Sequence, residues 1–162
     1  MAISLIRMLT VCATVIGMSF GVSGISHSET SDLDQVKAAN EAYYTALSAR
    51  DLSAMERVWA QSPRDVNVAP PVRPAAHTGW NTIKRNYQTF WATLDELTVT
   101  MAEPKIVIHG SVAWVYGIEQ SKRKAKNGEV SGGPNFGTSI FIKESGRWLM
   151  VFHQAALIPG PK

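Results

Sequence analysis

Residues 31–63 read SDLDQVKAANEAYYTALSARDLSAMERVWAQSP, a stretch that predicts two helices joined by a very short turn. Ser31, with Asp34 three residues later, forms a weak capping box at the start of the first helix. The Arg50-Asp51 pair interrupts the helical pattern, and Ser62-Pro63 ends the second helix because proline cannot continue it. The result is a helical hairpin. Its mostly apolar faces comprise Val36, Ala39, Asn40, Tyr43 and Leu47 in one helix and Leu52, Met55, Val58 and Trp59 in the other.

After this hairpin, the sequence pattern predicts a short strand, one more helix and then a series of strands. Val66–Val68 is a short strand, and residues 71–78 form a loop rich in proline and alanine. A third helix follows Thr78-Gly79, with a broad apolar face made by Trp80, Ile83, Tyr87, Phe90, Trp91 and Leu94. From Leu97 the apolar residues alternate, and turn signals at 109–111, 127–128 and 145–146 separate the strands. Helices followed by an antiparallel meander indicate an α+β fold.

The first two dozen residues have the order of features typical of a secretory signal peptide. Arg7 supplies a positive charge, Leu9 to Phe20 is almost wholly apolar, and Val22-Ser23-Gly24 ends the stretch with small residues. We expect cleavage near Gly24 and a periplasmic or secreted protein; an uncleaved N-terminal anchor is the alternative. Residues 25–31 are then a flexible tail, and 32–158 are a single domain.

Composition argues against several classes of function. The sequence has 16 Lys and Arg against 13 Asp and Glu, and loss of Arg7 would leave 15 against 13, which is no signature of nucleic-acid binding. The basic run at 122–126 precedes the Asn127-Gly128 turn and is interpreted as a solvated hairpin end. The only cysteine, Cys12, lies in the leader, and the four histidines are scattered, so we expect no disulfide, metal or cofactor.

Three helices that cover one face of a short, curved sheet would leave a cone-shaped cavity. Cavities of this kind bind small apolar molecules. We therefore expect the cavity to be the site of any ligand chemistry.

Three motifs resemble the SnoaL-like domains of the NTF2-like superfamily, which share the ketosteroid isomerase-like fold. They are the hairpin segment from Ala42 through Arg50-Asp51-Leu52 to Trp59-Ala60, the Thr78-Gly79-Trp80 opening of the third helix, and the closing strand from Gly146 to Ala155. The resemblance covers residues 32–158. It implies the cone fold and a homodimer formed through the outer sheet faces, but it does not specify a function, because this fold hosts enzymes, binders and oligomerisation modules.

The ketosteroid isomerases allow a comparison of site residues. Tyr43 matches their oxyanion-binding tyrosine, and Tyr87 matches the tyrosine that supports it. Their general-base aspartate corresponds to Ala69, before Pro70, and their second oxyanion donor corresponds to Thr138. An alanine cannot hold a proton, so the resemblance argues against steroid isomerisation by that mechanism.

Other residues are candidates through their position on predicted strands. The resemblance implies that Leu149, Val151, His153 and Ala155 face the cavity from the last strand, where His153 is the titratable group. We expect the same side to hold Trp114, Tyr116 and Ile118, and we expect Glu119 to point outward into solvent. Catalytic candidates are His153 and Tyr43; ligand-contact candidates are Tyr87, Trp114, Tyr116, Ile118, Thr138 and Val151.

The leading hypothesis is an exported protein that binds a small hydrophobic molecule, with cofactor-free proton transfer (isomerisation, dehydration or cyclisation) as its chemistry. In that case His153 carries the proton and Tyr43 stabilises an oxyanion. The alternative is a non-catalytic dimeric scaffold. In the alternative, Trp114, Tyr116 and Met101 would collapse into the cavity and fill it.

Overall fold

The computed structural model describes residues 31–68 and 76–158. The predicted signal peptide, most of the predicted tail, Ala69 and most of the proline-rich loop lie outside the described residues. Among the residues described, no helix is both long and apolar enough to cross a membrane.

The helical hairpin predicted from residues 31–63 is confirmed. Helix α1 spans Asp32–Ala49, and the Ser31 side chain accepts a hydrogen bond from the Asp34 amide at its start. Arg50 ends the helix in the left-handed conformation. Asp51 then caps α2 (Leu52–Val58) by accepting from the Ala54 amide. A short side chain that accepts from an orphan amide is the usual way to begin a helix, so the sharp reversal is encoded locally.

The third helix, α3, spans Trp80–Trp91, and the chain then enters the sheet. Leu94, predicted to extend the helix, instead begins strand β3 (Leu94–Met101). Helical spacing alone could not exclude Leu94, because it is buried either way. The turn at Ala92 and Thr93, whose amides bond to Gln88 and Phe90 carbonyls, separates the two elements.

Within residues 31–68 and 76–158, the sheet has seven strands and is curved and unclosed. Its order is β2-β1-β7-β6-β5-β3, with β4 (Lys105–His109) paired to β5 beyond the end of β3. The remaining strands are β1 (Val66–Val68), β2 (Ala76–Thr78), β5 (Val112–Ala125), β6 (Val130–Glu144) and β7 (Arg147–Leu157). All pairings are antiparallel except that of β1 with β7, so the predicted antiparallel sheet is in fact mixed.

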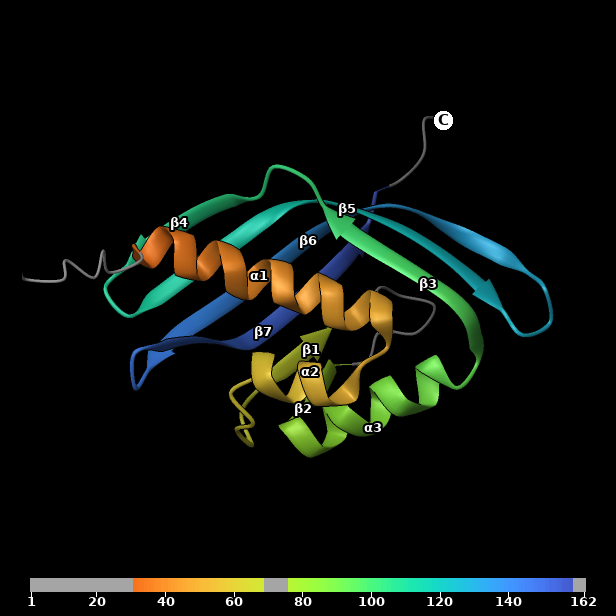
Figure 1. Ribbon diagram of the computed structural model, residues 1–162, viewed down its shortest axis with the longest axis horizontal. Helices are drawn as coiled ribbons and strands as arrows, with labels where there is room; N and C mark the ends of the chain where they lie inside the picture. Colours follow the sequence, from red (N-terminus) through yellow and green to blue (C-terminus); the bar gives the residue numbers. More distant parts are fainter. Residues whose placement is uncertain (1–30, 69–75, 159–162) are drawn as a thin grey trace, which may run out of the picture.

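Strands β5 and β6 are longer than predicted. The alternating pattern in the sequence predicts strands only over 112–120 and 136–143, whereas the pairing continues to Lys124 opposite Val130. The first three residues of the basic run, 122–124, are therefore strand, Lys126 belongs to the turn, and the turn at 127–128 lies where it was predicted. Figure 1 shows that the β5–β6 hairpin projects beyond the helices.

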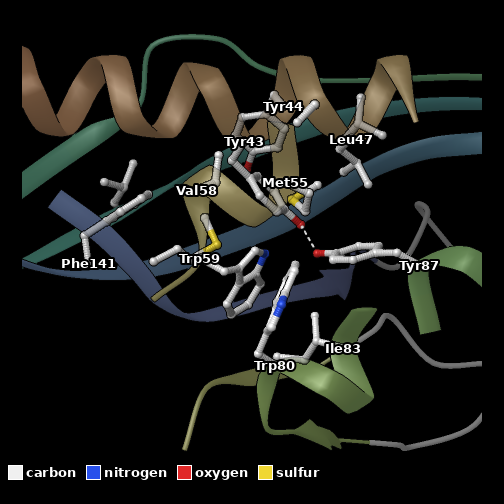
Figure 2. Packing of buried hydrophobic residues seen from close by; sticks show 14 of the residues in the cluster. Tyr43, Tyr44, Leu47, Met55, Val58, Trp59, Trp80, Ile83, Tyr87 and Phe141 are labelled. Atoms are coloured by element: carbon white, nitrogen blue, oxygen red, sulfur yellow. Dashed lines mark hydrogen bonds between the residues drawn. The ribbon is translucent and has the colours of Figure 1, made fainter. Parts of the chain in front are cut away.

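The helices all lie against one face of the sheet, with α1 running across it and α2 and α3 beside β1 and β2 (Figure 1). The core forms between these layers, where Tyr43, Met55, Trp59, Ile83 and Phe141 are almost completely buried. Figure 2 shows side chains from all three helices converging on this region. The architecture is the α+β cone that the sequence predicted.

Candidate functional site

A cavity of about 250 Å³ lies between the helices and the sheet. One part of its wall is apolar and comprises Leu47, Val68, Phe90, Leu97, Val99 and Ala155. The other part is polar or aromatic with a polar tip, and comprises Tyr43, Asn67, Asn86, Tyr87, Glu119, Ser121, Arg123 and Asn135. An apolar wall with a few convergent polar groups is the usual form of a small-molecule site.

Two tyrosines and an asparagine form a hydrogen-bonded chain in this wall. The hydroxyls of Tyr43 on α1 and Tyr87 on α3 lie 3.3 Å apart, as the dashed line in Figure 2 shows. The Asn67 side-chain amide on β1 donates to the Tyr87 hydroxyl at 3.2 Å. If Tyr87 in turn donates to Tyr43, the Tyr43 proton is free to bond a ligand oxygen. Burial, with the nearby Tyr87 and Glu119 side chains, raises the pKa of Tyr43 well above its usual value, so the phenol stays a donor.

Glu119 on β5 is the carboxyl group of the cavity wall. It is 3% exposed, so the prediction that it points into solvent was wrong. Its Oε1 atom accepts a 2.6 Å hydrogen bond from the Tyr44 hydroxyl and lies 3.4 Å from His153 Nε2. Burial raises the pKa of Glu119 to about 7, although the Tyr44 hydrogen bond acts in the opposite direction. Both protonation states are therefore populated near neutral pH.

Gly137 on β6 makes room for the Glu119 side chain. A Cβ atom at this position would lie 2.6 Å from Glu119 Cγ and Cδ. Gly137 pairs with Gly117 of β5, so the neighbouring inward position on β5 is also empty of side chain. A paired glycine in the middle of two long strands marks a place where something approaches the backbone closely. Here the approaching group is the carboxyl of Glu119.

His153 on β7 supports Glu119 from behind the cavity wall. Its Nδ1 atom lies 3.1 Å from the Ser139 hydroxyl, and its ring centre lies 4.6 Å from that of Tyr43. Ser139 is completely buried, and neither residue lines the cavity. Burial lowers the pKa of His153 to about 3, so the imidazole is neutral and its contact with Glu119 is not an ion pair at neutral pH. The inward position predicted for His153 is therefore correct, but the group that faces the cavity is Glu119.

The predicted inward positions on β5 were wrong by one residue. Trp114, Tyr116 and Ile118 lie on the outer face, where each is about two-fifths exposed, and none lines the cavity. The inward set begins with the buried Ala113 and Val115. The larger apolar side chains thus lie on the face that the helices do not cover. The prediction assigned them to the covered face because they are apolar.

Thr138 is also on the outer face. It lies opposite Tyr116 and Gln154 in the sheet, and residues directly opposite each other in antiparallel strands share a face. The inward residue of this part of β6 is its neighbour Ser139. The position predicted for the second oxyanion donor therefore does not reach the cavity.

A β-bulge in β7 explains why only some of the residues predicted to face the cavity from this strand do so. Ile140 pairs with Phe152 but Phe141 pairs with Met150, so Val151 has no residue opposite it. The extra residue shifts the alternation: Met150 and His153 are both buried, whereas Val151 is only half-buried and does not line the cavity. Ala155 lines the cavity as predicted, but Leu149 and Val151 do not.

The described residues contain no cluster of three or more His, Cys, Asp or Glu side chains placed to hold a metal ion.

A second buried carboxyl belongs to Asp65, four residues before Ala69 in the sequence. Burial raises its pKa to about 6, but its Oδ2 atom accepts the Ser62 amide and it does not line the cavity. Asp65 therefore does not replace the aspartate of the ketosteroid isomerases.

Comparison with known proteins identifies the family to which this fold belongs. The SnoaL-like domain family matches residues 36–159, and the chain belongs to this family. No functionally curated protein matches the sequence.

Solved structures with the same fold include proteins of the NTF2-like and ketosteroid isomerase-like groups. A proposed dehydratase of the NTF2-like family from Streptomyces avermitilis is 19% identical with a TM-score of 0.71, over 80% of this chain and 98% of that one. An NTF2-like superfamily protein from Salmonella enterica is 19% identical with a TM-score of 0.71, over 78% and 92%. A ketosteroid isomerase-like protein from Erwinia carotovora atroseptica is 19% identical with a TM-score of 0.68, over 81% and 99%. At this identity the likeness establishes the fold.

Proposed function

We propose that this protein binds a small, mainly hydrophobic molecule in the cavity and catalyses proton transfer on it without a cofactor. The observation that carries the proposal is the presence of Glu119 and Tyr43 in one cavity wall, since they supply a proton carrier and a hydrogen-bond donor. Isomerisation, dehydration and cyclisation can all use a proton carrier together with a hydrogen-bond donor to an oxygen.

In the proposed reaction, Glu119 is the general base. Its carboxylate removes a proton from a carbon next to a ligand carbonyl, and the electron pair moves onto the carbonyl oxygen. Tyr43 donates a hydrogen bond to that oxygen, while Tyr87, held by Asn67, donates to Tyr43. The protonated Glu119 then returns the proton to another carbon of the ligand, or to a departing hydroxyl group. A pKa of about 7 suits both steps near neutral pH.

The role of His153 is then to position Glu119. A neutral imidazole 3.4 Å from Oε1, itself held by Ser139, and the Tyr44 hydroxyl, which donates to the same oxygen, together hold the carboxyl in place. This assignment differs from the expectation that His153 carries the proton. The lowered pKa and the position behind the wall support it.

Turnover of cyclohex-3-enone tests this proposal. Its conversion to the conjugated cyclohex-2-enone needs one proton removed and one returned, and it is followed by ultraviolet absorbance. We expect wild-type protein to catalyse it, and Glu119→Gln to lose the activity while still binding the product in ligand-observed NMR. Equal rates for wild type and Glu119→Gln would refute the proton-transfer role. Glu129→Gln, which changes an exposed carboxylate in the β5–β6 turn, is the matched control.

The non-catalytic scaffold is the second candidate, and one of its expectations is not met. The three side chains that would have filled the cavity, Trp114, Tyr116 and Met101, do not line it. The scaffold hypothesis keeps one supporting feature, the apolar outer face of the sheet. This feature does not compete with catalysis in the cavity, because it lies on the opposite side of the strands.

We also propose that two copies pair through the outer face. Ile118 lies opposite Phe136, and the rings of Tyr116 and Phe136 are 6.4 Å apart, so exposed side chains adjoin across the two strands. Trp114 and Val107 extend this surface onto β4. Contiguous exposed apolar surface of this kind marks association sites. We expect a dimer in analytical ultracentrifugation that Ile118→Lys converts to a monomer; a wild-type monomer would refute the pairing.

Export remains part of the proposed function. It depends on the order of charge, apolar stretch and small residues in the first 24 positions. The compartment would be the periplasm or the exterior.

A further inference from the structure

The inner face of β5 carries a row of polar side chains that ends in a cation. Glu119, Ser121 and Arg123 alternate along the strand, and all three line the cavity. Residues of a strand advance by about 3.4 Å each, so the Cα atoms of Glu119 and Arg123 are about 14 Å apart. The cavity therefore has an acidic end at Glu119 and a basic end at Arg123.

Arg123 is set apart from the basic run around it. The residues on either side of it, Lys122 and Lys124, alternate to the opposite face, and Lys124 lies 3.6 Å from Glu96. The Arg123 Nε atom donates to the Ser131 hydroxyl at 2.7 Å. Within the part of the chain that the structure describes, no carboxylate lies within ion-pair distance of its guanidinium. Its two terminal nitrogens form the planar fork that suits a carboxylate.

A buried acceptor lies between the two ends. Asn135 on β6 is 6% exposed and lines the cavity, and its Nδ2 atom donates to the Ser121 hydroxyl at 3.4 Å. Its Oδ1 atom has no hydrogen-bond partner among the described residues. A buried acceptor without a partner is costly, and a ligand hydroxyl would satisfy it.

We propose that the ligand of this cavity is an amphipathic carboxylic acid: an apolar body of about one substituted ring, a carboxylate bound by Arg123, and an oxygen at the Tyr43–Glu119 end. The inference rests on the proposed function and narrows its substrate class. Apolar groups of the ring contact Phe90, Leu97 and Val99. A polar group on the body that donates a hydrogen bond meets Asn135.

Charge then fixes the direction of the ligand. A carboxylate placed near Glu119 would be repelled by it, whereas the Arg123 guanidinium attracts it at the other end. Size agrees with one ring, since an engineered cavity of about 150 Å³ holds benzene and this cavity is about 250 Å³.

The test compares trans-4-hydroxycinnamate with its methyl ester by isothermal titration calorimetry on the full domain. These probes differ in one negative charge. For wild type we expect the acid to bind about tenfold tighter than the ester, as one charge-assisted hydrogen-bond pair predicts. Arg123→Gln should abolish that preference and leave the affinity for the ester unchanged. Lys122→Gln removes the same charge from the opposite face and should leave the preference intact.

The outcomes separate this inference from the proposed function. If the ester binds and the acid is no tighter, or if Lys122→Gln weakens the acid as much as Arg123→Gln does, carboxylate recognition by Arg123 is wrong while ligand binding in the cavity stands. If neither compound binds wild type at millimolar concentration, both proposals fail. Circular dichroism of Arg123→Gln at each temperature used confirms that the variant is folded, which keeps a lost preference interpretable.

Discussion

Replacing Glu119 with glutamine should make the protein more stable at neutral pH. Glutamine has the same shape, and its carbonyl can still accept the Tyr44 hydroxyl. It removes only the need to ionise a carboxyl that is 3% exposed. The expected gain follows from the raised pKa.

The sign and size of this effect come from proton linkage. The pKa of Glu119 is about 7 in the folded protein, against 4.5 for the free side chain. Between these pH values the folded protein holds a proton that the unfolded chain releases, so rising pH favours unfolding. The difference between these two pKa values, at about 1.4 kcal/mol per unit, lowers the free energy of unfolding of wild type by about 3 kcal/mol once the pH is above both. Glu119→Gln should therefore match wild type at pH 4 and exceed it by about 3 kcal/mol at pH 8.

Urea unfolding of both proteins at pH 4, 6 and 8 measures the difference directly. The comparison with the variant is necessary because His153 opposes the trend: its pKa of about 3 means that wild type loses stability as the pH falls below 6.5. At pH 8 the melting temperature of Glu119→Gln should be higher by about 10 °C. The control, Glu129→Gln, should change stability by less than about 0.5 kcal/mol at any pH. A Glu119→Gln protein that is less stable at pH 8, or whose difference from wild type does not vary with pH, would refute the buried, neutralised carboxyl.

Three further predictions concern the site and the leader. Gly137→Ala should lower the free energy of unfolding by about 1–3 kcal/mol, because its Cβ would lie 2.6 Å from the Glu119 side chain. In urea titrations, adding Glu119→Ala should reverse most of this loss. A double variant as unstable as Gly137→Ala would contradict the steric cause. Tyr43→Phe should lower kcat for cyclohex-3-enone by about 10²- to 10³-fold while the product still binds detectably in ligand-observed NMR. An unaffected kcat would remove Tyr43 from the reaction. In a bacterial expression host, intact mass should show a chain beginning after Gly24, and a full-length chain would count against export.

Most of the fold could be predicted from the sequence because its signals are local. The capping residues Ser31 and Asp51 fix the helix starts, and the turns at 127–128 and 145–146 fix two hairpins. Each signal depends on a few neighbouring residues and on no distant contact. One error in the fold is at an element end, at Leu94, where helix and strand would bury the same side chain. The others depend on distant pairing: Ala76–Thr78, predicted as loop, forms β2 beside β1, and β1 runs parallel to β7.

The site was predicted less well because it depends on which face of each strand the helices cover. On β5 the alternation itself was predicted correctly, but the larger apolar residues, Trp114, Tyr116 and Ile118, are on the uncovered face. The usual rule that the more apolar face is buried then gives the opposite answer. An association surface on that face would account for this exception. On β7 the bulge at Val151 reverses the alternation partway, and no residue type at that position announces it.

The predicted stabilisation of Glu119→Gln also bears on why the carboxyl is there. Its contacts do not require a charge, because a glutamine could accept from Tyr44 and face the neutral His153 in the same way. Packing does not require a carboxylic acid either. The space that Gly137 leaves for this side chain would hold a glutamine of the same shape. The ionisable group lowers the free energy of unfolding by about 3 kcal/mol at pH 8, and an amide could replace it without losing a contact. The structure alone therefore gives no reason for an ionisable group at this position. Its ability to take up and release a proton in the cavity wall is the property that the amide lacks, and that property is what the proposed reaction uses.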